Sequence, residues 1–283
     1  MSGKRSKRHH HNPIVLQKPF QSKPGKIWYA EKNKDGRFFV FEERNHESAF
    51  WERNYNTTIE DGRPSDRLET GFWGAVDDHL GKLVPKIDDA LENSTIPLFS
   101  GEPLDSLYNL FAALMMRSPD ILPDYDAAEM GREVANQTIE LSTELSEKER
   151  TFLNSSDRMV QNGRHIIAMS RVAEPTRVLA ALREYEVRFV RSEARSAFIL
   201  GSRLVYRIGN GGNTHLDNPN TELWLPISPR STVVLVKSRP ETPHCVEFSR
   251  AKVRKFNEYV CRSSSKVGSH SYKLLRSLTR SKL

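Results

Sequence analysis

Residues 185–237 decide the fold class of this chain. They hold five short runs that are apolar or alternate between apolar and polar residues: YEVRFVRS (185–192), SAFILGS (196–202), RLVYRI (203–208), ELWLPIS (222–228) and STVVLVK (231–237). Runs of this length that are rich in β-branched and aromatic residues are typical of strands. The loop GNGGNTHLDNPN (209–220) is a strong break between two of them. We therefore predict a series of antiparallel strands here.

Two more strands are predicted near the N-terminus. KIWYAEKN (26–33) and RFFVFEE (37–43) flank the turn signal Asp35-Gly36, which favours a hairpin. A two-stranded hairpin alone is marginally stable. We therefore expect strands 27–41 to pair in the same sheet as strands 185–237.

The intervening residues, about 65–183, have a helical period. Asp66 and Glu69 form a capping pattern ahead of a first helix, which Pro85 should kink or end. Ser146 and Glu149 form a second capping box. Helices are also predicted over 104–117, 124–145, 175–183, 250–262 and 269–280.

Strands, helices, strands and helices in this order predict an α+β fold. We expect a mixed, mainly antiparallel sheet built from N- and C-terminal strands, with the helical insertion 65–183 packed on it. Helices 66–145 should form a layer on one side. Residues 1–8 are expected to be a disordered basic tail, and residues 9–283 a single domain.

Composition restricts the cellular setting. No run approaches the ~20 apolar residues that a membrane helix needs, and no signal peptide is visible. The two cysteines, Cys245 and Cys261, have no metal-site spacing. A reduced, intracellular and cytoplasmic setting without membrane contact is therefore expected.

Positive charge is concentrated at the two ends of the chain. The net charge is +7, from 43 basic and 36 acidic residues. Residues 1–26 and 262–283 contain 13 basic residues and no acidic one, so the part between them is mildly acidic. Basic ends suit DNA or RNA, although solubilising tails explain them equally well. The candidate nucleic-acid contacts are Lys4, Arg5, Lys7, Arg8, Lys273 and Arg276.

Known catalytic motifs are absent from the sequence. It has no phosphate-binding loop, no Gly-x-Ser-x-Gly elbow and no His-Glu-x-x-His pair. The histidine run His9 to His11 does not predict a zinc site, because three adjacent side chains of an extended segment cannot all face one ion. No metal site or cofactor is assigned, and the oligomeric state is left open.

Four ordered segments carry a family resemblance over about residues 9–262. They are HHHNPIVLQKPF (9–20), the series GKIWYAEK, AFWERNYNT and SDRLETGFWGAVDDHLGKLVPKI, the helix end NLFAALMMRSP, and the series FILGSRLVYRI, ELWLPISP and VRKFNEYV. In this order they resemble the DUF4238 family, a domain of unknown function. The resemblance picks out His9 and His10 in the first segment.

One position departs from the family pattern. After the strand around residue 200 the family typically shows an Asp and then a Pro, and here Ser202 and Leu204 stand in those places. If that Asp has a chemical role in relatives, this chain has lost it. The family carries no established activity, so the resemblance implies the fold and leaves the function open.

Two classes of function follow from these residues. In the first, the protein binds an anionic partner such as nucleic acid, and one histidine pins the N-terminus structurally. In the second, His9 or His10 joins Glu52, Glu69 and Arg117 in a pocket between sheet and helices, as base, orienting groups and charge clamp. That pocket would serve a nuclease or phosphodiesterase-like hydrolase, metal-dependent or not, with a role in defence against foreign genetic elements. His10 is the candidate base because it is nearer to the apolar run.

Overall fold

The computed structural model describes residues 8–121, 126–142, 144–173, 176–209, 212–237 and 243–279. Residues 1–7 of the predicted tail lie outside this part. The contacts divide the chain into two compact units, each described by itself. Unit 1 comprises residues 1–10, 51–75 and 122–174, and unit 2 comprises residues 11–50, 76–121 and 175–283. The expectation of a single domain stays a prediction.

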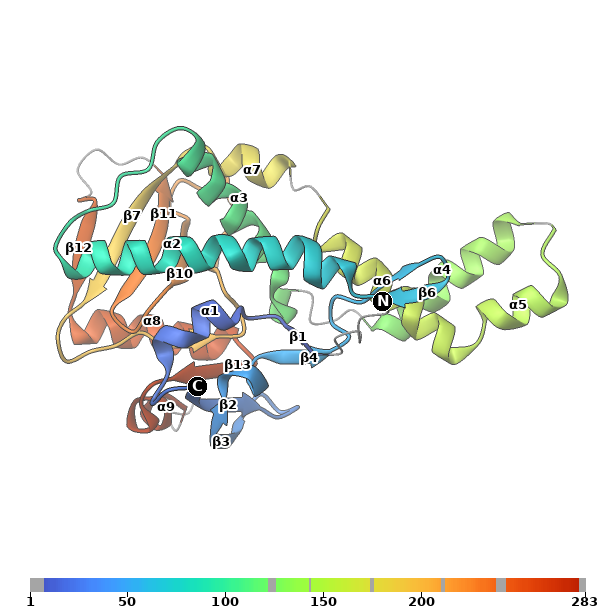
Figure 1. Ribbon diagram of the computed structural model, residues 1–283, viewed down its shortest axis with the longest axis horizontal. Helices are drawn as coiled ribbons and strands as arrows, with labels where there is room; N and C mark the ends of the chain where they lie inside the picture. Colours follow the sequence, from blue (N-terminus) through green and yellow to red (C-terminus); the bar gives the residue numbers. More distant parts are fainter. Residues whose placement is uncertain are drawn as a thin grey trace. The chain divides into compact units, whose positions relative to one another are not determined.

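Unit 2 is organised around a five-stranded sheet (Figure 1). Its strands lie in the order β12, β7, β11, β10, β9. All neighbours are antiparallel except β12 and β7, which are parallel. The bounds are β7 (Tyr185–Ser192), β9 (Tyr206–Ile208), β10 (Glu222–Pro226), β11 (Ser231–Lys237) and β12 (Cys245–Phe248). Except for SAFILGS, each predicted segment of 185–237 contains one of these strands.

Both faces of this sheet are buried. Leu223, Leu225, Val233 and Leu235 belong to one apolar core, together with buried residues of α2 (Gly74–Glu92) and α3 (Glu102–Arg117). Trp224, Val234 and Val236 alternate with them and belong to a second core, together with α8 (Arg250–Ser263) and α9 (Tyr272–Thr279). Because successive strand residues point to opposite faces, the fully apolar runs are explained by helices on both sides.

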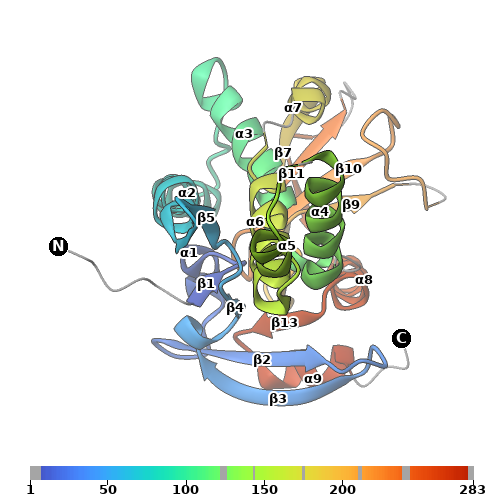
Figure 2. The same cartoon turned by 90° about the vertical axis from the view of Figure 1, so that its right-hand side faces the viewer.

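The N-terminal hairpin belongs to a second sheet, which corrects one prediction. β2 (Lys26–Lys32) and β3 (Phe38–Asn45) lie in a four-stranded sheet of order β3, β2, β13, β8. Its other strands are β13 (Lys266–Ser269) and β8 (Leu200–Gly201). The hairpin thus joins C-terminal strands, but the expected sheet with 185–237 is wrong except for β8. Figure 2 shows β2 and β3 as a long curved pair.

Unit 1 combines short strand pairs with helices. β1 (Arg8–His10) pairs with β4 (Trp51–Arg53), and β5 (Thr58–Glu60) pairs with β6 (Arg63–Ser65). The helices are α4 (Ala127–Leu141), α5 (Glu147–Leu153) and α6 (Ser156–Ser170). Gly131 meets Met159 while Gly163 meets Ala127, so α4 and α6 are antiparallel and in backbone contact. Of the predicted helices 66–145, α4 therefore belongs to unit 1, whereas α3 and nearly all of α2 belong to unit 2.

The helix boundaries confirm some signals and correct others. The capping box of Ser146 and Glu149 is present and opens α5. The pattern of Asp66 and Glu69 does not cap a helix; the chain forms a π-helical segment, η3 (Leu68–Trp73), without a side-chain cap. Pro85 lies inside α2, which runs on to Glu92. Short helices α1 (Ile14–Gln17) and α7 (Thr176–Leu182) complete an α+β fold.

The α4–α6 contact yields a stability prediction. A Cβ at Gly131 would lie 1.8 Å from the Met159 carbonyl oxygen, and one at Gly163 would lie 1.7 Å from that of Ala127. Gly131→Ala and Gly163→Ala should therefore lower the free energy of unfolding by about 1–3 kcal/mol or more in urea titrations. Gly81→Ala is the matched control, because its Cβ meets nothing closer than 3.9 Å and Ala favours a helix. Equal effects of all three variants would contradict this packing.

Candidate functional site

The predicted histidines lie on β1 in unit 1. His9 pairs with Glu52 and His10 with Trp51 across the β1–β4 ladder. His9 is fully buried, and its Nδ1 accepts the backbone N–H of Asn56 at 2.8 Å. His10 is partly exposed. The two neighbours differ in burial, as expected of a strand, but the histidine held in the interior is His9, whereas the candidate base, His10, is partly exposed.

Asn56 links His9 to the second predicted carboxylate. Its side-chain amide donates to Glu69 Oε2 at 2.7 Å, and Asn56 itself is buried. Unit 1 therefore brings His9, Glu52 and Glu69 into one neighbourhood. The hydrogen bond that His9 accepts comes from a backbone N–H. This bond orients the imidazole ring and connects β1 to the segment after β4.

Sequence reasoning missed Arg171 in this neighbourhood. Its guanidinium carbon lies 3.5 Å from the centre of the Tyr55 ring, and Nη1 donates to the Tyr55 carbonyl oxygen at 2.9 Å. Burial lowers the pKa of Arg171, while Tyr55 and Glu52 oppose that shift. No local pattern marks this arginine, because it follows an amphipathic helix end that lies more than a hundred residues from Tyr55.

Arg117 belongs to unit 2. Its side chain is fully buried at the end of α3, and both terminal nitrogens donate to the carboxylate of Asp77, one of them at 3.2 Å. The bidentate pair satisfies the guanidinium inside unit 2. The predicted grouping of Arg117 with His9, Glu52 and Glu69 stays a prediction, because Arg117 and these three belong to different units.

Ser202 occupies a carboxylate-binding position. Its hydroxyl donates to Asp120 Oδ2 and also accepts the backbone N–H of Lys266 at 3.1 Å. Asp120 Oδ1 accepts the N–H of Ser265 at 3.2 Å. A carboxylate is therefore present beside residue 202, supplied by the segment after α3, and an aspartate at 202 would face it directly.

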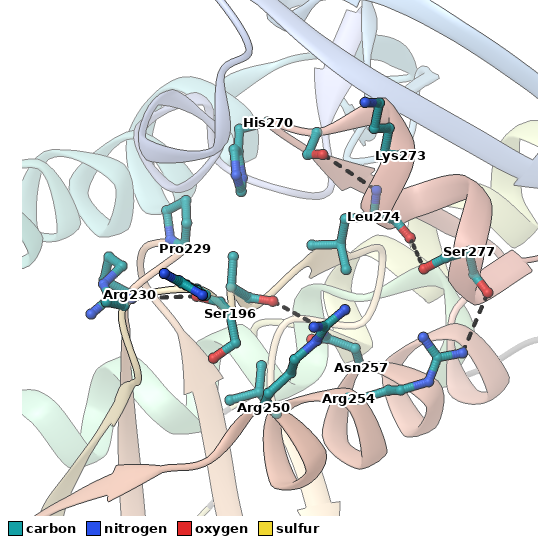
Figure 3. A pocket seen from close by; sticks show the side chains of 15 residues that line it. Ser196, Pro229, Arg230, Arg250, Arg254, Asn257, His270, Lys273, Leu274 and Ser277 are labelled. Carbon is teal, nitrogen blue, oxygen red and sulfur yellow. Dashed lines mark hydrogen bonds between the residues drawn. The ribbon is translucent and has the colours of Figure 1, made fainter.

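Unit 2 also contains a basic pocket of about 550 Å³ (Figure 3). Four segments line it: residues 194–197, residues 229–230, the first half of α8, and residues 270–277. Five lining residues carry a positive charge, and none of the described lining residues is acidic: Arg195, Arg230, Arg250, Arg254 and Lys273. We call this the α8–α9 pocket.

Two of the five cations hold the walls together. Arg230 Nη1 donates to the carbonyl oxygens of Glu193 and Ser196, which fixes the turn after β7. Arg254 pairs with Glu258 at 3.0 Å and reaches the Ser277 carbonyl on α9. These contacts connect the segments around the pocket, as the dashed lines of Figure 3 show for part of the network.

The other three cations are uncompensated. Within the described part of the chain, the side chains of Arg195, Arg250 and Lys273 make no ion pair. The nearby carboxylate of Glu193 accepts the backbone N–H of Arg250 at 2.7 Å, at the start of α8. Burial lowers the pKa of His270, so that near pH 7 the charge of the pocket comes from arginine and lysine.

A match of the chain to a family model was found over residues 8–270, and that model describes a protein of unknown function, DUF4238. The chain belongs to the DUF4238 family. Neither the curated proteins nor the solved structures gave a match.

Two DUF4238-like segments of the sequence meet at the α8–α9 pocket. Asn257, in VRKFNEYV, is buried; its Oδ1 accepts the N–H of Ile199 and its Nδ2 donates to the Ala197 carbonyl. Pro229, in ELWLPISP, lines the pocket and accepts the N–H of Phe198 at 2.9 Å through its carbonyl oxygen. The residues that carry the DUF4238 resemblance therefore build one wall of the pocket.

The predicted nucleic-acid residues are placed differently from one another. Lys273 lines the pocket. Arg276 lies outside its lining, with its guanidinium 4.6 Å from the Phe41 ring centre. Arg8 lies on β1 of unit 1, 5.0 Å from the Trp51 ring centre. Lys4, Arg5 and Lys7 lie outside the described residues.

The described residues hold neither a metal cluster nor a membrane-spanning helix. No group of three or more His, Cys, Asp or Glu side chains among them could hold a metal ion. No helix in the same residues has the length and apolar character to cross a bilayer.

The buried histidine yields a prediction that separates the two histidines. His9→Ala leaves the N–H of Asn56 unpaired in the interior, which costs about 1–3 kcal/mol of stability. His10→Ala should cost less, because the side chain is partly exposed. Urea unfolding of both variants measures the difference, and an equal or larger loss for His10→Ala would contradict the assignment.

Ser202 yields a prediction about charge. Ser202→Asp sets a buried carboxylate against that of the half-buried Asp120 and should cost about 3 kcal/mol of stability at pH 7. Ser202→Ala removes the hydrogen bonds of the hydroxyl with Asp120 and with the Lys266 N–H, and should cost about 1–2 kcal/mol.

Asp120→Asn should rescue most of the Ser202→Asp loss in a double-mutant cycle, because it removes one of the two charges. Additive losses in that cycle would show that the two carboxylates do not meet.

Proposed function

We propose that the protein binds an anionic, phosphate-bearing partner, nucleic acid above all, in the α8–α9 pocket. The observation that carries this proposal is the group of three cations, Arg195, Arg250 and Lys273, which make no ion pair within the described part of the chain. They line one concave site whose described lining contains no acidic residue. Arginine forks match the geometry of phosphate oxygens, and lysine adds a mobile point charge.

The electrostatics of the pocket support an anion rather than a neutral ligand. Bringing several like charges together costs free energy, and a bound anion relieves it. A single exposed surface charge is common and contributes little. These three charges differ because a turn and two helix starts bring them to the lining of one pocket. The pocket volume of about 550 Å³ lies within the ordinary range for ligand sites.

We further propose that the protein acts in the cytoplasm. The two cysteines are free thiols, and Cys261 is buried. Reduced cysteines suit a reducing compartment.

The hydrolase alternative has weaker support. A general base must reach its substrate proton within hydrogen-bond distance. His9 is buried with Nδ1 occupied by a backbone N–H, which speaks against His9 as that base. His10, the candidate base, is partly exposed, and this contact does not involve it. The nuclease or phosphodiesterase-like activity, and the role in defence, stay predictions.

Salt-dependent binding tests the proposed function. Fluorescence anisotropy with a labelled single-stranded oligonucleotide should show affinity that falls steeply with salt, because phosphate contacts release counterions. The double variant Arg250→Gln, Lys273→Gln should weaken binding and reduce the slope of log K against log salt by about 0.7 for each phosphate that the variant no longer neutralises.

Lys86→Gln is the matched control in the same unit. Lys86 is an exposed residue of α2, the helix that packs on the opposite face of the sheet from α8. A chain without residues 1–8 separates the contribution of the basic tail. Wild-type binding by the double variant would contradict a role for the pocket, and no binding at ~50 mM salt would contradict the nucleic-acid proposal itself.

A further inference from the structure

The lining of the α8–α9 pocket restricts what part of a phosphate ligand it can recognise. No Phe, Tyr or Trp is among the described residues that line it, and the ring that is present is the imidazole of His270. The apolar lining side chains are small or aliphatic: Ala194, Ala197, Pro229, Val253 and Leu274. Proteins that hold unpaired bases usually stack them on aromatic rings. The pocket therefore lacks a large aromatic platform, and stacking of a base there is limited to the His270 ring and the arginine planes.

Two polar groups of the wall that could read a base are already occupied within the protein. The amide of Asn257, the kind of group that reads a base edge, is already bonded to Ile199 and Ala197 through both of its ends. Ser271 Oγ accepts the N–H of Leu274 and so caps α9. What remains for a ligand is positive charge and the Nδ1 of His270, a buried atom that makes no hydrogen bond among the described residues.

The amount of charge distinguishes two kinds of phosphate. An internal phosphodiester carries one negative charge on two non-bridging oxygens. A phosphate monoester carries about −1.5 to −2 near pH 7 and presents three acceptor oxygens. The uncompensated cations Arg195, Arg250 and Lys273 match the second group better, in charge and in number of donors.

Two helices begin at the pocket and add to this preference. Arg250 is the first residue of α8, and Lys273 is the second residue of α9. The positive end of a helix dipole favours an anion, and a dianion more than a monoanion. Glu193 already accepts the N–H of Arg250, so the ligand relies on the three side chains and not on that N–H.

We infer that the α8–α9 pocket recognises a phosphate monoester chiefly through its phosphate group. This inference rests on the proposed function and names the chemical group that is bound. Such a phosphate monoester has two possible sources, the phosphorylated end of a nucleic-acid strand and a free mononucleotide. Both present the same terminal phosphate, and the experiment distinguishes them.

The test compares matched ligands on the full chain. One oligonucleotide sequence is prepared with a 5′-phosphate, with a 3′-phosphate and with hydroxyl at both ends, alongside adenosine and cytidine monophosphates. A phosphorylated strand or mononucleotide should bind at least about tenfold more tightly than the strand with hydroxyl ends, a difference of about 1.4 kcal/mol. The two mononucleotides should bind alike.

Variants assign the discrimination to the pocket. Arg250→Gln and Lys273→Gln should each reduce the preference for the phosphorylated ligand, whereas Lys86→Gln should keep it. Thermal unfolding curves verify that each variant is folded. If Arg250→Gln does not fold, Lys273→Gln and Arg195→Gln carry the test, since both residues are exposed.

The outcomes separate this inference from the proposed function. Equal affinity for phosphorylated and hydroxyl ends overturns the inference and leaves nucleic-acid binding intact. A strong preference between the two mononucleotides would show that the base decides binding, and it overturns recognition chiefly through the phosphate. Tight binding of a phosphorylated strand but not of mononucleotides identifies the strand end as the source, and the reverse identifies the free nucleotide. If no phosphate ligand binds at ~50 mM salt, the inference and the proposed function both fail.

Discussion

Six of the seven residues of β11, Ser231 to Val236, are buried, and the strand bonds to β7 on one side and β10 on the other. An apolar strand with no exposed face can form only if elements cover both of its sides. In unit 2, α2 and α3 supply one cover and α8 with α9 supply the other. The α8–α9 pocket exists because the second cover is made of two short helices whose starts lie near the turn after β7.

The local elements of unit 2 were largely predictable from the sequence. The runs YEVRFVRS and STVVLVK are strands, and 250–262 is a helix, because their patterns agree with their final surroundings. β13 was missed. Its sequence KVGS contains a glycine and a serine, and it is a strand only because β2 and β8 lie on either side. Strand formation of this kind is decided by tertiary pairing.

The candidate pocket was mostly beyond sequence reasoning. Lys273 was predicted as a nucleic-acid contact, but Arg195, Arg230, Arg250 and Arg254 were not. They are spread over about sixty residues, and no spacing rule connects a turn, a second turn and a helix start. The signal that could have found them is the recurrence of arginine beside serine at element ends, in RSEARS, SPRS and SRAKVR. Of the two histidines singled out in the sequence, His9 is buried and makes a structural hydrogen bond.

The pairing of β2 with β13 joins residues near 30 to residues near 267. A contact between residues so far apart in the sequence forms slowly, although the entropic cost of closing the loop grows only with the logarithm of the loop length. During synthesis the hairpin β2–β3 emerges early, and one edge of it waits without a partner until β13 has left the ribosome. An open strand edge is a template for pairing with other chains. Translation past β13 therefore supplies the strand that covers this edge, and a chain released before residue 266 would lack it.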